Sequence, residues 1–341
     1  MITLEHDRLE FQVPEVHEDA RFNISFQRTL RIPDDDTDYP LPPGLGRFPL
    51  RHVDDYADRL SERDLRRGGI ILPMHQAEAM WINFETQGPR RFGYPFAVKI
   101  AAGKINAVTG KPWSEHLNDD PQDYMVVPEQ PWLDGYSVGQ GIIRQFVAMP
   151  LGAGYSAEEQ ITGAAEFGGL QIMAWPMKAD FYERILAARL KREQEELRGP
   201  QPCYSMMPDA EMSMGLAPGG RMRQAIYDDP YGLDAWDQRH GSRCFVTIAN
   251  TANWIAVTGE VPPTSPPTAA DYSRRGLPWF EYYNADAEVL AGSKVLGDLK
   301  SVKRMGEASG ESPLPENESV EGILPFRLGR QIRKVLREGK F

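Results

Sequence analysis

Alternation of hydrophobic and polar residues is the strongest pattern in the chain. Over residues 21–32 (RFNISFQRTLRI), the even positions are hydrophobic and the odd positions are polar, and only Arg28 breaks the alternation. Because successive side chains of a strand point to opposite faces, this period of two predicts a half-buried strand. Shorter apolar runs predict further strands, at residues 70–73, 80–84, 125–128, 142–150 and 170–175.

Two segments have the pattern of a β-hairpin. Residues 95–110 (PFAVKIAAGKINAVTG) contain an alternating run and a turn near residues 102–103, and residues 244–259 contain two apolar runs. In each segment a Phe precedes an AVTG tetrapeptide by eleven residues, Phe96 in the first and Phe245 in the second. Two similar β lobes would produce this correspondence, and so would chance.

Helices are predicted at fewer places. Residues 180–198 carry an apolar side, begin with acidic residues and end at a Gly-Pro pair. Residues 54–67 suit a short polar helix that Gly68 and Gly69 would stop. Ser156 and Glu159 have the spacing of a capping box, which predicts one or two helical turns after residue 156.

Proline divides the chain into an arm, a body and a tail. Residues 39–50 (YPLPPGLGRFPL) hold four prolines and two glycines, so they predict an extended arm that packs either on its own domain or on a neighbouring subunit. Residues 261–270 (VPPTSPPTAA) predict a stiff linker. We therefore expect a main body over residues 1–260, which two lobes would divide near 199–225, and a tail region over residues 261–341.

The C-terminal segment, residues 326–341 (FRLGRQIRKVLREGKF), predicts a basic amphipathic helix. Its apolar residues recur at i, i+4, i+7 and i+8, and it holds six cations and one anion. Such a helix suits an anionic membrane surface, a nucleic acid or an acidic protein surface. We favour docking on an acidic sibling chain. The candidate binding residues are Arg327, Arg330, Ile332, Arg333, Lys334, Val335, Leu336 and Arg337.

Composition and charge narrow the class of protein. The 341 residues are 41% hydrophobic and 26% charged, which is ordinary for a globular protein. A net charge of −11 disfavours general binding to nucleic acid. The first residues lack the apolar core of a signal peptide, and no apolar run is long enough for a membrane helix, so we expect a soluble, cytoplasmic protein.

Catalytic signatures are missing from the sequence. It contains no GxSxG, GxxxxGK[ST] or HExxH motif, and its two cysteines form no CxxC. His75 and Glu78 could share a helix face as a metal or base pair, or form a local polar pair. The segment DQRHGSRC brings a candidate base, His240, and Asp237 close to two candidate nucleophiles, Ser242 and Cys244, but triad members usually come from distant segments.

Two further clusters allow a functional and a structural interpretation. The loop 228–237 (DDPYGLDAWD) could supply oxygen ligands for Ca²⁺, or it could be a solvated turn that uses Asp for local hydrogen bonds. Its candidate ligands are Asp228, Asp229, Asp234 and Asp237. The aromatic residues of 279–283 (WFEYY) could stack on sugars or bases, or anchor a core or an interface.

Several segments resemble a family of uncharacterised bacterial and fungal proteins. The segments that carry the resemblance are YPLPPGLGRFPLRHVDD (39–55), YPFAVKIAAGKINAVTG (94–110), VVPEQPWLDG (126–135), IIRQFVAMPLGAGY (142–155), FGGLQI (167–172) and MGLAPGGRMRQAIYDDPYGLDAWD (214–237). The resemblance covers most of the chain, and it implies no activity, cofactor or catalytic residue.

These patterns predict a β-rich α+β fold with antiparallel sheets and a few peripheral helices. The first functional hypothesis is a non-enzymatic structural or binding protein that forms a homo-oligomer through its arms and its basic C-terminal helix. The second is an enzyme of unrecognised type, such as a metal-assisted hydrolase that uses His75, Glu78, His240 or the 228–237 loop. The third is a carbohydrate-binding protein. No cofactor is predicted except the candidate Ca²⁺, and a protein partner is an open alternative.

Overall fold

The fold is built on a large sheet that brings together distant parts of the chain. The computed structural model describes residues 1–86, 93–196, 214–283, 287–311, 318–320, 323 and 325–329. Within these residues, the main path of the large sheet has the order β1-β2-β3-β8-β14-β16-β4, and β5, β12 and β13 pair beside it. Its strands are β1 (Ile2–Glu5), β2 (Arg8–Gln12), β3 (Arg21–Thr29), β4 (Asp38–Tyr39), β5 (Gly44–Arg47), β8 (Ala79–Thr86), β12 (Trp132–Leu133), β13 (Gly135–Gly139), β14 (Ile142–Pro150) and β16 (Met214–Arg223).

A second sheet has the order β10-β9-β15-β17-β7-β6, with β11 paired to β9. Its strands are β6 (Arg51–His52), β7 (Ile70–Pro73), β9 (Phe96–Ala102), β10 (Ile105–Asn106), β11 (Met125–Val127), β15 (Leu170–Pro176) and β17 (Ser242–Ala249). A short parallel pair, β18 (Phe280–Tyr283) and β19 (Phe326–Gly329), stands apart from both sheets. Most pairings are antiparallel, but β16–β4 and β17–β7 are parallel, so the β-rich α+β class is confirmed.

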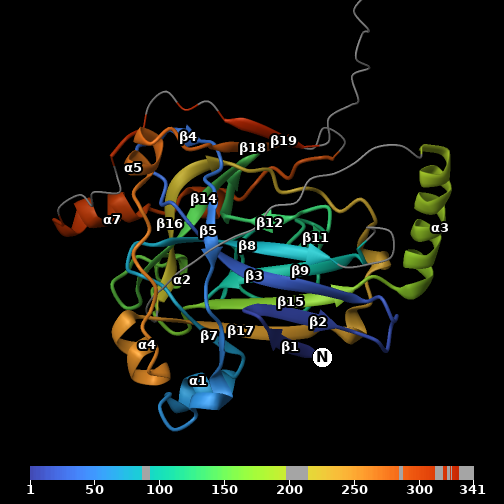
Figure 1. The fold of residues 1–341 in the computed structure, drawn as a ribbon, viewed down its shortest axis with the longest axis horizontal. Helices are drawn as coiled ribbons and strands as arrows, with labels where there is room; N and C mark the ends of the chain where they lie inside the picture. Colours follow the sequence, from blue (N-terminus) through green and yellow to red (C-terminus); the bar gives the residue numbers. More distant parts are fainter. Residues whose placement is uncertain are drawn as a thin grey trace, which may run out of the picture.

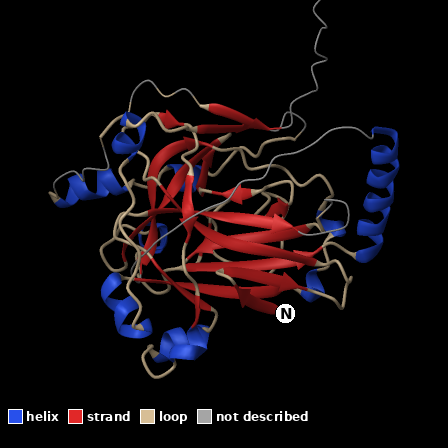
Figure 2. Cartoon of the chain, viewed as in Figure 1, coloured by secondary structure: helices blue, strands red, loops and turns tan. Residues whose placement is uncertain are grey.

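Helices lie around the sheets and not between them (Figure 2). They are α1 (Glu62–Arg67), α2 (Ala157–Thr162), α3 (Ala179–Glu196), α4 (Thr251–Thr258), α5 (Ala269–Arg274), α6 (Lys294–Gly297) and α7 (Val302–Ser309), with 3-10 turns η1 (Val53–Tyr56), η3 (Leu233–Ala235) and η4 (Gln238–His240). Figure 1 shows α3, the longest of them, at one edge of the molecule. In the part of the chain that the structure describes, no helix is long and apolar enough to cross a membrane.

The two sheets pack against each other through a shared hydrophobic core. Phe22, Ile24 and Phe26 of β3 belong to the same buried cluster as Phe96 and Val98 of β9. The rings of Phe22 and Phe96 lie with their centroids 4.5 Å apart. Each strand therefore turns its apolar positions toward the other sheet, as a period of two requires.

The predicted strand at residues 21–32 exists, but it is not half-buried. From Phe22 to Thr29 every residue of β3 is buried, including the polar Asn23, Ser25 and Gln27. The alternation predicted correctly which face of β3 is apolar and which is polar. It did not predict that the polar face is also buried. The proline-rich arm covers part of this face, where Thr29 Oγ1 donates a hydrogen bond to the backbone oxygen of Pro43 at 2.9 Å.

The proline-rich arm packs on its own chain. Its strand β5 pairs with β3, with Arg28 opposite Gly46 and Thr29 opposite Gly44. Leu41 exchanges two backbone hydrogen bonds with Phe280 of β18, at 2.8 and 2.9 Å. Within the described residues the arm thus follows the first of the two alternatives, a segment laid on its own domain.

Residues beyond 260 share the core of the body. Trp279 and Leu296 are buried in the main hydrophobic cluster, and Val302 of α7 lies in a second cluster with Ala79 and Val147. Ser293, the N-cap residue of α6, donates a hydrogen bond from Oγ to the backbone oxygen of Thr109, at 2.6 Å. The expected boundary near residue 260 therefore separates segments that are packed together.

The first predicted hairpin is confirmed and the second is wrong. β9 and β10 pair antiparallel around Gly103, which adopts a φ of +57°. After β17, however, the chain forms helix α4 where a second strand was expected. Asn250 caps α4 by accepting a hydrogen bond from the backbone of Asn253, Trp254 is buried beneath the helix, and Gly259 ends it in the left-handed conformation. The AVTG tetrapeptides thus fold differently, so they give no support to two similar lobes.

Other expected helices have mixed outcomes. The helix expected at residues 180–198 is α3, and the capping box of Ser156 and Glu159 is present at the start of α2. The expected helix over residues 54–67 is divided into η1 and α1. In the C-terminal segment, Phe326–Gly329 form strand β19, so the prediction of helix is wrong for these four residues.

Arg28, the residue that interrupts the alternation, forms a buried ion pair. Its Nε donates to Oε1 of Glu78 at 2.6 Å, and the two side chains are 2% and 0% exposed. The second carboxylate oxygen of Glu78 accepts from the backbone of His75 at 2.9 Å, and Nη2 of Arg28 donates to the backbone oxygen of Thr264 at 2.9 Å. The pair therefore joins β3, the turn before β8 and the proline-rich linker.

We predict that Glu78→Gln destabilises the fold by about 3–5 kcal/mol, because it leaves the buried guanidinium of Arg28 without its counter-charge. Replacing both residues by apolar ones (Arg28→Met with Glu78→Leu) should cost less than the single change. Arg184→Ala, which breaks an exposed ion pair with Asp180, is the control and should leave stability nearly unchanged. Urea unfolding measures the stability of all three variants. If Glu78→Gln were as stable as the wild type, the role given to the pair would be contradicted.

Candidate functional site

An open pocket of about 550 Å³ lies against the large sheet. Its lining residues come from β3, β8 and β12 of the sheet, from the arm, from the start of β2 and from β18. They are Arg8, Gln27, Leu41, Pro42, Pro43, Gly44, Gly46, Arg47, Trp81, Asn83, Glu85, Trp132, Asp134 and Phe280. A volume of this size is in the range that holds a small-molecule ligand.

The floor of the pocket is the polar face of β3 and β8. Gln27 pairs with Trp81, and Ser25 pairs with Asn83, so these side chains share one face of the sheet. Ile82 and Phe84, at the intervening positions of β8, point to the core between the sheets. The face that the alternation predicts to be polar is therefore the face that carries the pocket.

The polar side chains of the floor are connected by hydrogen bonds. Gln27 Nε2 donates to Ser25 Oγ at 3.0 Å, and Asn83 Nδ2 donates to the same oxygen at 3.4 Å and to Glu85 Oε1 at 2.9 Å. Glu85 Oε2 then lies 3.5 Å from Nη2 of Arg8. These contacts hold the side chains in fixed orientations, which reduces the entropy lost when a ligand binds.

Tryptophan rings form the apolar part of the lining. Trp81 and Trp132 meet edge to face, with centroids 6.1 Å apart and planes at 67°, and Tyr282 packs against Trp132 at 4.9 Å. Both tryptophans are half-buried, so part of each ring remains accessible. Gly44 of the arm lies so close to Trp81 that a Cβ at this position would stand 3.1 Å from Cζ2 of the ring. The absence of a side chain at Gly44 thus leaves room for the Trp81 ring.

Asp134 is a buried residue that holds Trp132, one of the two tryptophans of the pocket, by a hydrogen bond. It is buried, its Oδ2 accepts a hydrogen bond from Nε2 of Gln224 at 2.7 Å, and its carboxyl group also accepts from the side chain of Trp132. Burial raises the pKa of Asp134 to about 7, although both hydrogen bonds act in the opposite direction. The protonation state of this carboxyl group therefore changes near neutral pH, directly beside a ring that lines the pocket.

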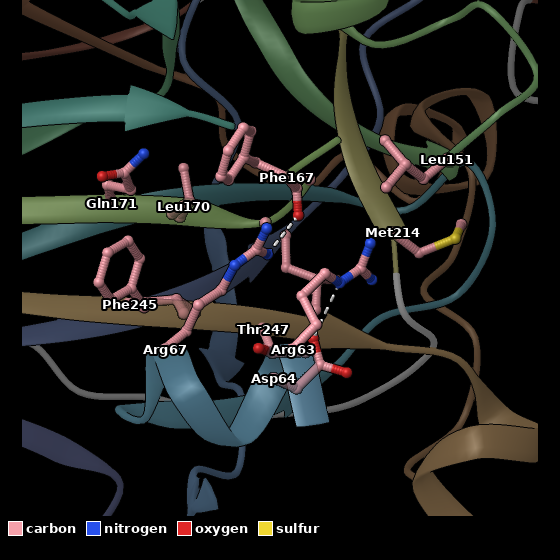
Figure 3. Close-up of a pocket in the computed structure, with 14 residues that line it drawn as sticks. Arg63, Asp64, Arg67, Leu151, Phe167, Leu170, Gln171, Met214, Phe245 and Thr247 are labelled. Atoms are coloured by element: carbon pink, nitrogen blue, oxygen red, sulfur yellow. Dashed lines mark hydrogen bonds and ion pairs between the residues drawn. The ribbon is translucent and has the colours of Figure 1, made fainter. Parts of the chain in front are cut away.

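A second hollow, of about 50 Å³, lies between α1 and the second sheet. Figure 3 shows Arg67 reaching from α1 to the backbone oxygen of Phe167, where it donates a hydrogen bond at 2.7 Å. The Arg67 guanidinium also lies over the Phe167 ring, 4.7 Å from its centroid. At roughly 10–15 Å³ for each water, this hollow has room for a few waters and not for a substrate.

His75 and Glu78 lie in a turn and not on a helix. Glu78 is committed to Arg28, as described above, and the ring of His75 lies 3.2 Å from the backbone oxygen of Pro263. Burial lowers the pKa of His75, which favours its neutral form. The two residues are adjacent, but their contacts join the linker to the body.

The DQRHGSRC segment places His240 against Asp237 and buries Cys244 in a strand. His240 Nδ1 lies 3.0 Å from Oδ2 of Asp237, in the 3-10 turn before β17. Cys244 is buried in β17, where burial raises the pKa of its thiol to about 12. A thiol that stays protonated is a poor nucleophile.

Two of the four candidate carboxylates of the 228–237 loop, those of Asp229 and Asp237, are used in hydrogen bonds within the chain. Oδ2 of Asp229 accepts from Tyr124 Oη at 2.6 Å and from Trp236 Nε1 at 2.8 Å, and Asp237 accepts from the backbone of Arg239 at 3.0 Å. Across the described ranges, no three His, Cys, Asp or Glu side chains are grouped as metal ligands would be. The Ca²⁺ site at Asp228, Asp229, Asp234 and Asp237 stays a prediction.

The remaining candidates divide between the pocket and the undescribed tail. Of the aromatic residues 279–283, Phe280 lines the pocket, whereas Trp279 is buried in the core. Arg327 lies in β19. The other candidate binding residues of the tail fall outside the described residues: Arg330, Ile332, Arg333, Lys334, Val335, Leu336 and Arg337.

Sequence reasoning did not find the pocket, although a signal for it exists. In β8 (AMWINFET), Met80, Ile82 and Phe84 alternate with Trp81, Asn83 and Glu85. A tryptophan on the polar side of an alternating strand indicates an apolar patch on that face, and such patches often bind a ligand or another protein. The sequence alone could not reveal that β3 presents its polar side chains next to this strand.

We predict that the stability of the wild type falls relative to that of Asp134→Asn as pH rises from about 4 to about 7. The folded protein holds the Asp134 proton up to about pH 7, whereas the unfolded chain releases it near its ordinary pKa of 3.8. The stabilisation is therefore complete below pH 4 and is lost as pH rises, by an amount on the order of a few kcal/mol. Urea unfolding of both proteins between pH 4 and pH 8 measures the difference, and parallel curves would contradict the prediction.

Comparison with known proteins assigns no family to the chain. No protein-family model matches it, and neither does any curated protein or solved structure. The resemblance seen in the sequence therefore stays untested.

Proposed function

We propose that this chain is a carbohydrate-binding protein and that its ligand occupies the pocket on the large sheet. The observation that carries the proposal is the pairing of half-buried Trp81 and Trp132 with the polar floor of Gln27, Asn83 and Glu85 in one pocket of about 550 Å³. This is the third hypothesis from the sequence, now attached to particular residues. It differs from the sequence hypothesis in its aromatic residues, since only Phe280 of the 279–283 cluster lines the pocket.

A sugar ring fits the two kinds of surface in this pocket. Its faces carry C–H groups that pack on an indole ring, and its rim carries hydroxyl groups that both donate and accept hydrogen bonds. Amide and carboxylate side chains, such as those of Gln27, Asn83 and Glu85, are suited to bind these hydroxyl groups. Their mutual hydrogen bonds orient them before the ligand arrives.

A purely apolar ligand suits the pocket less well. It would cover Asn83, Glu85 and Arg8 and remove water from them without offering hydrogen bonds in return. A buried polar group that loses its partner costs about 1–3 kcal/mol, and a charged group costs more. The polar floor therefore selects against such ligands, whereas Trp81 and Trp132 favour a ligand with an apolar face.

We expect a glycan array to identify oligosaccharides that bind this protein, and calorimetry with the best of them to show one site per chain. Trp81→Ala and Trp132→Ala should each weaken binding about tenfold, or about 1.4 kcal/mol, because each removes a ring on which the sugar packs. Gly44→Val should weaken binding as well, since a Cβ at position 44 would stand 3.1 Å from the Trp81 ring.

Trp113→Ala provides the matched control. Trp113 is half-buried like the two pocket tryptophans, but it contacts Lys99 in a different part of the molecule. This variant should bind as the wild type does. An array without signal above background, or tryptophan variants that bind like the wild type, would refute the proposal.

Self-association through the C-terminal segment stays a separate prediction. Its basis is the contrast between a segment with six cations and one anion and a whole chain of net charge −11. Removing residues 330–341 leaves the strand β19 in place, and it should reduce the particle size in light scattering if the segment docks on a sibling chain. An unchanged particle size would contradict this prediction.

A further inference from the structure

Two arginines meet at one corner of the pocket. Arg8 begins β2, directly after the turn at His6 and Asp7, and Arg47 ends β5 of the arm. Both line the pocket. They therefore come from separate segments of the chain that pack together at this corner.

Contacts between the β1–β2 turn and the arm fix this corner. Arg47 Nη1 donates to the backbone oxygen of His6 at 3.0 Å, and the backbone of Leu50 donates to Oδ1 of Asp7 at 2.9 Å. His6 and Asp7 both have positive φ, at 50° and 56°, which is the geometry of a tight hairpin turn. The turn that precedes Arg8 is thus tied to the segment that carries Arg47.

The corner contains hydrogen-bond donors that lack acceptors. Among the described residues, the Nε–H of Arg8 and the Nε1–H of Trp81 are buried and have no hydrogen-bond partner. Each such group costs about 1–3 kcal/mol when it is left unsatisfied.

The charge at the corner favours an acceptor that is an anion. Arg8 has one carboxylate near it, that of Glu85, and the 3.5 Å separation is long for a hydrogen bond. Glu85 also accepts from Asn83, so it is shared between two partners. Burial and the nearby charge of Arg8 both lower the pKa of Arg47, while the carboxylates of Glu85 and Asp7 act in the opposite direction. A negative group in the pocket would lie beside both guanidinium groups, which line it.

We propose that the pocket recognises acidic sugars, and that Arg8 and Arg47 bind the carboxylate of a hexuronic acid residue. The flat guanidinium fork matches the two oxygens of a carboxylate, and both arginines line the pocket. The sugar ring of the same residue then packs on Trp81. This inference rests on the proposed carbohydrate-binding function and adds the class of sugar.

The test compares two ligands that differ only in the acid group. A hexuronic acid oligosaccharide and its carboxyl-reduced counterpart, in which each carboxylate is replaced by a hydroxymethyl group, are titrated into the full chain by calorimetry. We expect the acidic form to bind at least about tenfold more tightly. Raising NaCl from 50 to 300 mM should weaken binding of the acidic form and leave the reduced form nearly unaffected.

Variants show whether the two arginines cause the preference. Arg8→Gln and Arg47→Gln should each bring the affinity ratio of acidic to reduced ligand toward one, because each removes a charged group that would bind the carboxylate. Arg66→Gln, at an exposed position of α1 outside the pocket, should keep the ratio of the wild type. Thermal unfolding of each variant identifies any loss that comes from misfolding.

The outcomes separate this inference from the function on which it rests. If the two ligands bind equally well, or if neither arginine changes the ratio, acid recognition is refuted and carbohydrate binding stands. If only neutral glycans bind on the array, acid recognition is again refuted and carbohydrate binding again stands. If no glycan of any kind binds, both proposals are refuted.

Discussion

The buried ion pair of Arg28 and Glu78 is the contact on which the arrangement of this molecule depends. A charge inside a protein must have a partner at a fixed position, because the free energy of its lost hydration cannot be recovered otherwise. Here the partner lies in the turn before β8, and the same guanidinium binds the linker at Thr264. Arg28 also lies over the ring of Phe48, 5.8 Å from its centroid, so the arm is held at the same point. One side chain thereby links β3 to the turn before β8, to the linker and to the arm.

The pocket is a consequence of using both faces of one sheet. The apolar face of β3 and β8 builds the core with the second sheet, and the polar face carries the pocket, which residues of the arm help to line. Burying a polar face is tolerated here because Ser25, Gln27, Asn83 and Glu85 bond to one another in place of water. The arm can lie across this face because its glycines take little space.

The charge distribution of the pocket differs from that of the whole chain. The protein carries a net charge of −11, yet two arginines lie together at one corner of its pocket. Of the two acidic groups in the lining, Glu85 is shared between Arg8 and Asn83, and Asp134 is buried with a pKa of about 7. In the lining, the carboxylate of Glu85 is therefore paired, and burial opposes the ionisation of Asp134.

The sequence by itself determined the local elements. A period of two located β3 and its two faces, and an apolar periodicity between acidic residues and a Gly-Pro pair located α3. The prediction from the sequence was wrong at residues 253–259, where Asn250 and Gly259 cap a helix around the buried Trp254. A short apolar run does not distinguish a strand from a helix. Only the tertiary structure decided that the polar face of β3 is covered, that Arg28 meets Glu78, and that Trp81, Trp132 and Arg8 line one pocket. Those residues lie far apart in the chain, and strand pairing brings them together, which no local pattern encodes.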